Sequence, residues 1–108
     1  MLTLYGLKSC DTCRKARRSA EKAGKNIIFV DIRETPLAPD ERTRFLAAFG
    51  EDLINRRSAT WRNLSEKERA KDPDTLLATH PTLMKRPVVD GAVLTLGWSP
   101  ETEKVHLG

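Results

Sequence analysis

The fold is decided within residues 2–30, LTLYGLKSCDTCRKARRSAEKAGKNIIFV. Residues 2–5 have the composition of a short strand, residues 6–9 form a loop, and from Asp11 the apolar positions recur at helical steps. The apolar face of this helix comprises Cys13, Ala16, Ala20 and Ala23. The continuous apolar run at residues 27–30 is typical of a strand buried on both sides. Strand, helix and strand in so short a stretch predict a βαβ unit with a right-handed crossover.

The middle of the chain predicts helices separated by turns. Residues 36–39 (PLAP) mark a loop, and the helix that follows ends at Gly50. The inward face of this helix comprises Phe45, Leu46 and Phe49. Residues 51–57 predict a further short helical turn. The last helix of the region is capped by Asp72 and cannot continue past Pro81.

The C-terminal part predicts a β-hairpin and a final helix. Asp90 and Gly91 stand between two β-rich runs, which is the pattern of a two-residue hairpin. Ser99 then caps a short helix whose first residue is Pro100. The order β-α-β, helical middle, β-β-α predicts an α/β fold. We expect a thioredoxin-like (glutaredoxin-like) mixed four-stranded sheet with a helical insertion before the C-terminal β-hairpin.

The length of 108 residues is enough for one small domain but not for two. We expect a single domain over 1–108, in which residues 1–33 and 81–108 form the βαβ and ββα core and residues 37–80 the helical insertion. Hydrophobic residues make up 39% and charged residues 31%, which favours a soluble globular protein over a disordered or fibrous one. No run approaches the ~20 apolar residues of a membrane helix. No export leader is visible either, so we expect a cytoplasmic protein without membrane contact.

The net charge of +4 is concentrated near the two cysteines. Residues 1–33 contain eight Lys or Arg against three Asp or Glu, whereas residues 34–108 contain eleven against twelve. Positive charge at this end of the chain would favour an anionic partner, such as an acidic protein surface or a small oxyanion. The alternative is that these residues only form a solvent-exposed helix face. No recognition motif for nucleic acid accompanies it, so we expect no direct nucleic-acid binding.

Both cysteines of the chain, Cys10 and Cys13, lie at the start of the first predicted helix. With two distant histidines they lack the spacing of a zinc finger, so we expect no metal. A structural disulfide between them would close too small a loop to add much stability. The alternative to a redox or nucleophilic role is that both cysteines are simply buried in the core. Free N–H groups at the helix start would lower the pKa of Cys10 from ~8.5 and make it an exposed nucleophile, with Cys13 as a shielded resolving thiol. Further positive charge comes from Arg14, Lys15 and Arg17.

Three segments of the chain resemble one known family: LYGLKSCDTCRKAR at 4–17, NRRSATWRNL at 55–64 and HPTLMKRPVV at 80–89. In this order, and over nearly the whole chain, they are similar to the arsenate reductase-like (ArsC-like) family of the thioredoxin-like superfamily. This family is also called the Spx/MgsR group, and the chain looks most like its YffB-like branch. Members reduce substrates with glutathione or glutaredoxin, or act as redox-sensing regulators that bind RNA polymerase. The resemblance therefore implies a redox-active center at the thiols.

The resemblance also implies roles for individual residues. The nucleophilic cysteine of the family corresponds to Cys10. Its first substrate-binding arginine corresponds to Arg57 or to Arg56, because both fit the motif, and its second corresponds to Arg86. Pro87 corresponds to the proline that forms a cis peptide bond facing the active cysteine. Guanidinium groups bind an oxyanion or a carboxylate through two hydrogen bonds, and a cis X–Pro turn exposes backbone groups to an extended peptide such as glutathione.

Two features depart from the family pattern. No arginine follows Arg86, where arsenate reductases have a third one, and Trp98 stands near its place. The Cys10 and Cys13 pair replaces the single cysteine of the monothiol enzymes, which would allow an internal disulfide. Supporting roles near the thiolate would fall to Lys8, Thr12, Arg14 and Arg56.

These features predict a thiol-dependent oxidoreductase of the arsenate reductase-like family, with glutathione as reductant and no bound cofactor. The catalytic residues would be Cys10 and Cys13. The substrate, a small-molecule thiol compound or an oxyanion, would be bound by Arg57, Arg86 and Pro87. The alternative is an Spx-like redox-sensing transcriptional regulator that binds RNA polymerase. Glutaredoxin is a further candidate partner.

Overall fold

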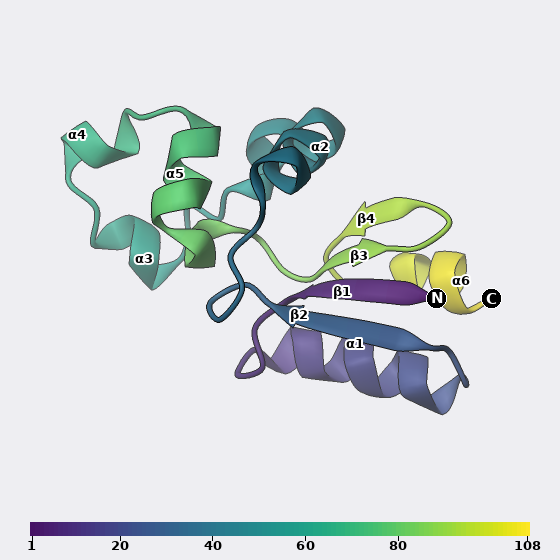
Figure 1. Cartoon of the computed structure of the whole chain (residues 1–108). Helices are drawn as coiled ribbons and strands as arrows, with labels where there is room; N and C mark the ends of the chain where they lie inside the picture. The colour runs from purple at the N-terminus through teal and green to yellow at the C-terminus, as the bar shows by residue number, and fades with distance from the viewer. The chain divides into compact units, whose positions relative to one another are not determined.

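The computed structural model describes all residues, 1–108. The chain forms two compact units, each of which is described by itself. The first unit comprises Met1–Ile32 together with Arg86–Gly108, and the second comprises Arg33–Lys85 (Figure 1). None of the helices has the length and hydropathy that crossing a membrane requires.

A mixed four-stranded sheet forms the centre of the first unit. Its strands are β1 (Leu2–Gly6), β2 (Ile27–Asp31), β3 (Val88–Asp90) and β4 (Leu94–Leu96). They lie in the order β2-β1-β3-β4, with β1 and β2 parallel and the other two pairs antiparallel. The parallel pair is joined by α1 (Asp11–Lys22), and α6 (Pro100–Leu107) follows β4. This arrangement confirms the predicted thioredoxin-like sheet and its βαβ unit.

Small side chains let α1 lie close to the sheet. Ala16 and Ala20 are fully buried in one cluster with Leu2, Leu4 and Val89. The margin of this core cluster is formed by Ile27, Phe29, Trp98 and Leu107. Because the last of these belongs to α6, and α1 and α6 also contact each other, both helices cover the same face of the sheet (Figure 1). This packing fixes the start of α1, where the cysteines lie, against β1.

The prediction that residues 27–30 are buried on both sides is wrong. β2 pairs only with β1 and is an edge strand, and Ile28 is 47% exposed. Of its side chains, Ile27 and Phe29 pack against the core cluster. Arg17 covers the ring of Phe29, with its guanidinium carbon 5.2 Å from the ring centre. The C-terminal hairpin occupies the other side of β1, and that long-range pairing leaves β2 at the edge.

The C-terminal hairpin has a three-residue turn, not the predicted two-residue turn at Asp90 and Gly91. β3 ends at Asp90, and the turn is closed by a hydrogen bond of 3.1 Å from Gly91 N to Val93 O. Gly91 does not adopt a positive φ. A Cβ at this position would instead lie 2.6 Å from the Leu2 side chain and 3.1 Å from Nδ1 of His106. The glycine therefore lets the turn approach the packed ends of β1 and α6.

His106 is a buried polar side chain on α6. The helix begins as predicted, since Ser99 Oγ accepts a hydrogen bond of 3.2 Å from Thr102 N. The Nε2 atom of His106 lies 2.8 Å from Oγ1 of Thr95 in β4. Burial lowers the pKa of His106, and the negative charge of Asp90 offsets this only in part. The folded chain therefore favours a neutral imidazole at this position.

We expect His106 to make the free energy of unfolding fall as the pH drops below about 6.5. The folded-state pKa is depressed, so the unfolded chain takes up the proton first and protonation favours unfolding. Urea unfolding at a series of pH values should show a flatter profile for His106→Gln. The control variant His80→Gln should keep the slope that His106 causes. A His106→Gln protein with the wild-type slope would contradict the buried neutral imidazole.

The second unit is helical. Its elements are α2 (Pro39–Phe49), η1 (Gly50–Leu53), α3 (Ala59–Arg62), α4 (Glu66–Arg69), α5 (Pro73–Thr79) and η2 (Pro81–Leu83). Pro39, expected in a loop, is the first residue of α2, where a missing N–H leaves no hydrogen bond unmade. Asp72 caps α5 as predicted, with its carboxylate 3.1 Å from Thr75 N. α2 packs against α5, and Arg42 of α2 pairs with Asp74 of α5 at 2.8 Å.

A β-bridge between Ile54 and Met84 closes the second unit. Asn55 N donates to Leu83 O, and Lys85 N donates to Leu53 O, both at 2.8 Å. The unit therefore extends to Lys85 rather than ending at residue 80. Its buried apolar side chains include Phe45, Leu53, Ile54, Leu76, Leu77, Leu83 and Met84. The bridge brings the NRR segment beside the lysine that starts the KRP segment.

Candidate active site

Cys10 occupies the N-cap position of α1. Its N–H donates to Leu7 O at 3.1 Å, and its carbonyl accepts from Arg14 N at 3.0 Å, so the loop and the first helical turn fix its backbone. The Cys10 side chain is half-buried, not fully exposed as predicted, and Cys13 is completely buried. Both thiols are free.

The pKa of the Cys10 thiol is lowered from its ordinary value. Burial is the largest single effect and would raise this pKa. The opposing hydrogen bonds come from the backbone and thiol of Cys13, the Arg86 guanidinium and the Thr12 backbone. Together they outweigh burial because each stabilises the thiolate more than the thiol. The lowered pKa agrees with the prediction, but its sources differ in part.

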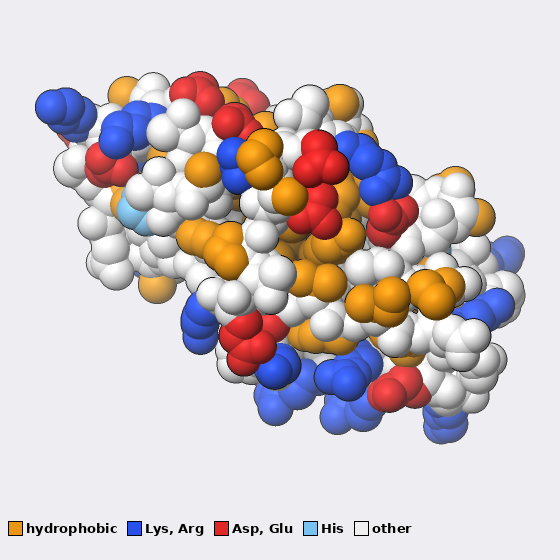
Figure 2. Space-filling model, viewed as in Figure 1, with side chains coloured by type: hydrophobic (Ala, Val, Ile, Leu, Met, Phe, Trp, Pro, Cys, Tyr) orange, Lys and Arg blue, Asp and Glu red, His pale blue; other side chains and the backbone are white.

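The positive charge at the thiolate is not supplied by the residues predicted from the sequence. Arg14 forms an ion pair with Asp11, and Arg17 lies over Phe29. The cation that hydrogen-bonds Cys10 is Arg86. Figure 2 shows Lys and Arg side chains along α1 at the lower edge of the view, on the solvent side of the helix. Side chains three or four positions apart on a helix contact each other, as Arg14 and Asp11 do here.

Cys13 has the opposite acid–base character. Its pKa is raised to about 12: burial is the largest cause, and a hydrogen bond with Cys10 and the charge of Cys10 act in the same direction. The Leu7 backbone and the Arg86 charge act in the other direction without prevailing. Cys13 therefore stays a thiol and donates its proton in a hydrogen bond to Cys10. When the pair loses one proton, the negative charge lies on Cys10.

Gly6, the last residue of β1, makes room for Cys13. A Cβ at Gly6 would overlap with the Cys13 sulfur and would lie 3.3 Å from the Cys13 Cβ. The sulfur has little freedom to move away, because the Cys13 side chain is completely buried. Strand β1 thus passes directly behind the buried thiol.

Gly6→Ala should lower the free energy of unfolding by about 1–3 kcal/mol, as overpacking of a close-packed core does. Cys13→Ala in the same chain should recover part of this loss, because it removes the sulfur that the new methyl group meets. Urea unfolding of the two single variants and the double variant measures the coupling between them. If the losses in free energy of unfolding of the two single variants simply add in the double variant, contact with the Cys13 sulfur is not what destabilises Gly6→Ala.

The peptide bond between Arg86 and Pro87 is cis, as the resemblance implied. Pro87 is fully buried, and its carbonyl accepts a hydrogen bond of 2.8 Å from Gly97 N. Arg86 is thus placed just before β3, with its side chain hydrogen-bonded to Cys10. The first unit therefore brings Cys10, Cys13 and Arg86 together, with Pro87 next in the chain.

Two supporting candidates, Lys8 and Thr12, form backbone hydrogen bonds near the thiols. Thr12 contributes its backbone N–H to Cys10, while its side chain is exposed. Lys8 N donates to Oδ2 of Asp31 at 3.0 Å, which ties the loop before Cys10 to the end of β2. These two backbone hydrogen bonds help to fix the conformation of the loop before α1 and of its first turn.

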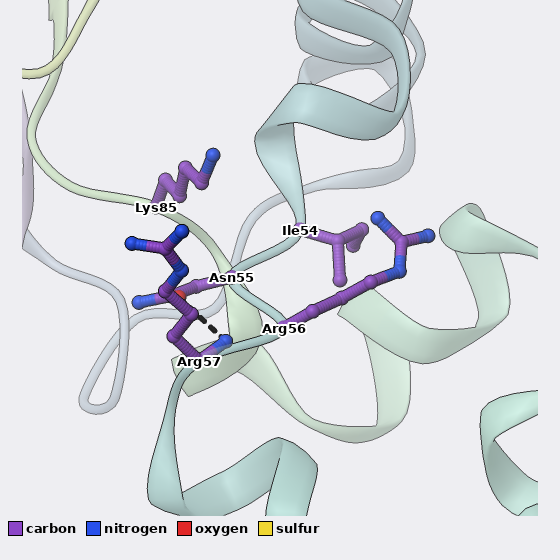
Figure 3. Close-up of a pocket in the computed structure, with 5 residues that line it drawn as sticks. All are labelled: Ile54, Asn55, Arg56, Arg57 and Lys85. Atoms are coloured by element: carbon purple, nitrogen blue, oxygen red, sulfur yellow. Dashed lines mark hydrogen bonds between the residues drawn. The ribbon is translucent and has the colours of Figure 1, made fainter.

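Arg56 and Arg57 lie in the second unit. They belong to a pocket of about 410 Å³ that is lined by Ile54, Asn55, Arg56, Arg57 and Lys85 (Figure 3). Arg56 is engaged, since its guanidinium pairs with Glu51 at 3.0 Å and lies 5.3 Å from the ring centre of Trp61. The Arg57 backbone N–H donates to Asn55 Oδ1 at 3.0 Å, but its guanidinium has no partner. Of the two arginines that fit the motif, Arg57 is the one free to bind a ligand.

Lys85 and Asn55 line this pocket but were not identified from the sequence. Each directly precedes a motif arginine, since Lys85 comes before Arg86 and Asn55 before the two arginines of NRR. Adjacency to these motifs was the only available signal. Their placement in one pocket follows from the bridge between two distant segments, which a local pattern does not reveal.

Trp98 packs against the core cluster of the first unit, and its Nε1 is buried without a hydrogen-bond partner. It therefore supplies no charge near the place where the resemblance would put a third arginine. No group of three or more His, Cys, Asp or Glu side chains is placed to hold a metal ion.

The first unit defines a class of protein. Its mixed sheet, the cysteine at the start of its first helix and the cis-proline before β3 are those of a thioredoxin-like protein with a thiol site. The chain belongs to the ArsC family, whose sequence pattern matches residues 5–105.

Individual relatives cover both units. The chain is 40% identical to an uncharacterised protein of Haemophilus influenzae, over 87% of this chain and 89% of that protein. It is 31% identical to the global transcriptional regulator Spx of Bacillus subtilis, over 94% of this chain and 82% of that protein. Among solved structures, the YffB protein matches with a TM-score of 0.89 and 28% identity, over 100% of both chains.

Proposed function

We propose that the chain is a thiol-dependent oxidoreductase of the arsenate reductase-like family, with Cys10 as nucleophile and glutathione as reductant. The observation that carries this proposal is the lowered pKa of Cys10 at the start of α1, with Cys13 and Arg86 as hydrogen-bond donors. The thiolate is the nucleophile in disulfide exchange, and a thiolate of low pKa is also a good leaving group. Both properties serve an enzyme that forms and then releases a mixed disulfide.

The proposed reaction has two exchange steps. In the first, the Cys10 thiolate attacks the glutathione sulfur of a disulfide between the substrate and glutathione. A bond forms between Cys10 and glutathione, the original disulfide breaks, and the substrate leaves as a thiolate that takes a proton from water. In the second, another glutathione thiolate attacks the bound glutathione sulfur, oxidised glutathione forms, and Cys10 leaves as a thiolate.

Cys13 is a slower resolving group than glutathione in this scheme. Its pKa of about 12 leaves almost no thiolate at neutral pH. When Cys10 is bound in a mixed disulfide, its charge no longer raises the pKa of Cys13, but burial, the larger cause, remains. Attack of Cys13 on Cys10, with release of glutathione and formation of an internal disulfide, would compete only when free glutathione is scarce.

We propose a mixed disulfide rather than arsenate as the substrate. The third arginine of arsenate reductases has no counterpart, because no arginine follows Arg86 and Trp98 packs into the core. Arg86 and Arg57 are the planar cations available to an anionic group of the substrate or of glutathione. We place this reaction in the cytoplasm, where glutathione is kept reduced, with glutaredoxin as a candidate partner.

The test is the reduction of the mixed disulfide of glutathione and 2-hydroxyethanethiol by purified protein and glutathione. Formation of oxidised glutathione is followed through glutathione reductase and NADPH. We expect a rate above the uncatalysed exchange, and no reduction of arsenate under the same conditions. A rate no higher than the uncatalysed one would overturn the proposal, as would arsenate being the only substrate reduced.

The similarity to Spx supports a second candidate function, a redox-sensing regulator that binds RNA polymerase. The pair of Cys10 and Cys13 would be its switch, and the basic outer face of α1 would meet an acidic surface. The test is binding of purified RNA polymerase to the reduced chain and to the chain oxidised with diamide. A complex that depends on the redox state, in a protein that is inactive as a reductase, would favour the regulator.

A further inference from the structure

The pocket of the second unit offers unpaired hydrogen-bond donors. The Arg57 guanidinium and the Lys85 ammonium group make no hydrogen bond or ion pair, and no lining residue is acidic. Oδ1 of Asn55 accepts the Arg57 N–H at 3.0 Å, which leaves Nδ2 of the same amide free to donate. In Figure 3 the Arg57 guanidinium and the Asn55 amide lie on the same side as Lys85, whereas Arg56 extends away from them.

These donors fit an anion. Two unpaired cations in one pocket repel each other, and a bound negative charge converts this repulsion into attraction. The planar Arg57 guanidinium matches a carboxylate through two parallel hydrogen bonds, while Lys85 adds a mobile point charge. The Asn55 amide is a third donor. Its orientation is already fixed by the Arg57 N–H, so binding costs little conformational entropy at this side chain.

Size and polarity narrow the class of anion. The volume of about 410 Å³ lies within the ~300–1,000 Å³ of small-molecule sites, so an inorganic oxyanion would fill only a small part of it. An ammonium group beside the carboxylate would lack a partner, because no lining side chain is acidic. The γ-glutamyl end of glutathione carries such an ammonium group, whereas the glycyl end carries a carboxylate alone. The lining therefore favours the glycyl end.

We propose that this pocket binds the C-terminal carboxylate of a small peptide thiol, with Arg57, Lys85 and Asn55 as its donors. The inference rests on the proposed function, because it assigns the pocket to the glutathione reductant. Lys85 and Asn55 are then specificity-determining residues of the reaction, in addition to the arginines of the family motif.

The experiment is a calorimetric titration of the full-length Cys10→Ser protein with S-methylglutathione, which cannot exchange thiols. We expect saturable binding that weakens about tenfold in Lys85→Met, the loss of one charge-assisted contact. Asn55→Asp keeps the acceptor for the Arg57 N–H but replaces the free donor with a negative charge, and it should abolish binding. Lys67→Met removes the same charge from an exposed site on α4 and should leave binding unchanged. Far-UV circular dichroism checks that each variant is folded.

Two further ligands separate the alternatives. S-methylglutathione with a glycine carboxamide end should bind at least about tenfold more weakly than the parent. Inorganic phosphate should bind more weakly than the parent peptide. Equal binding of the carboxamide, unchanged binding in Lys85→Met, or tighter binding of phosphate would each overturn the assignment. These titrations do not use the reactivity of Cys10. The reductase assay can therefore be negative while the peptide binds in the pocket, and the peptide can fail to bind while the reductase assay is positive.

Discussion

Cys10→Ser is expected to lower the glutathione-dependent rate by on the order of a thousandfold or more, which is the loss typical of an enzyme without its nucleophile. Serine is a favoured N-cap residue, so the fold should be retained when it replaces Cys10 at this position. The hydroxyl remains protonated at neutral pH, however, and cannot form the mixed disulfide. Steady-state rates with the glutathione–hydroxyethanethiol disulfide measure this loss.

Ser9→Ala is the matched control for this substitution. Ser9 is exposed, precedes Cys10 directly and has no partner of its own. Its variant should keep the wild-type rate, while Cys13→Ser should slow the reaction by changing the hydrogen bond to Cys10 without stopping turnover. Full activity of Cys10→Ser would transfer the nucleophile to Cys13 and refute the assignment made from the pKa values.

Arg86→Met should raise the pKa of the Cys10 thiol, because the guanidinium hydrogen bond is one of the contributions that lower it. Burial is the largest contribution and acts in the opposite direction, so the loss of this donor moves the pKa upward. Below the pKa, each unit of increase costs roughly tenfold in thiolate at a given pH. The rate of alkylation by iodoacetamide, measured against pH, should move to higher pH, and the reductase rate at pH about 7 should fall with it.

Arg18→Met is the control for charge alone. Arg18 is an exposed cation on α1 with no partner, and it does not hydrogen-bond Cys10. Its removal should leave the alkylation profile close to that of the wild type. If both substitutions moved the profile equally, the overall charge of the region rather than the Arg86 contact would set the reactivity of Cys10. The alkylation profile of Arg86→Lys should lie between those of the wild type and Arg86→Met, since lysine keeps the charge but not the planar donor.

Local patterns predicted the parts of the structure that depend on neighbouring residues. The helix after Cys10 and the caps at Asp72 and Ser99 follow from side chains within one turn of the backbone they stabilise. The βαβ unit follows from a helical period between two apolar runs. The cis bond before Pro87 came from the resemblance, since many X–Pro sequences have trans bonds.

The failures concern contacts between distant segments. The apolar run of β2 gave no sign that the hairpin would take the other side of β1 and leave Ile28 at the edge. Gly91 was interpreted through turn types, but close packing with Leu2 and His106 is what requires it. The place of Lys85 in the pocket depends on a β-bridge that pairs Ile54, in the middle of the second unit, with Met84 near its end.

In the site, too, the residues close in sequence were predicted and the remote contacts were not. Cys10 and Cys13 were found from spacing and helix position, and their contrasting acidities follow from one being at the cap and the other on the apolar face. The donor that matters most among the charged side chains, Arg86, is remote in sequence from Cys10. Nearby arginines looked equally suitable by sequence distance, but Arg14 has a carboxylate partner on its own helix.

The backbone is hydrogen-bonded on each side of the boundary between the two units. Lys85 N is bonded to Leu53 O, and two residues later the Pro87 carbonyl is bonded to Gly97 N, each at 2.8 Å. An inserted or deleted residue in this span would change the number of residues between the last hydrogen bond of the second unit and Arg86 and Pro87 of the first. We therefore expect length variation among natural homologues to be tolerated in the loops that join α3, α4 and α5, and to be absent here.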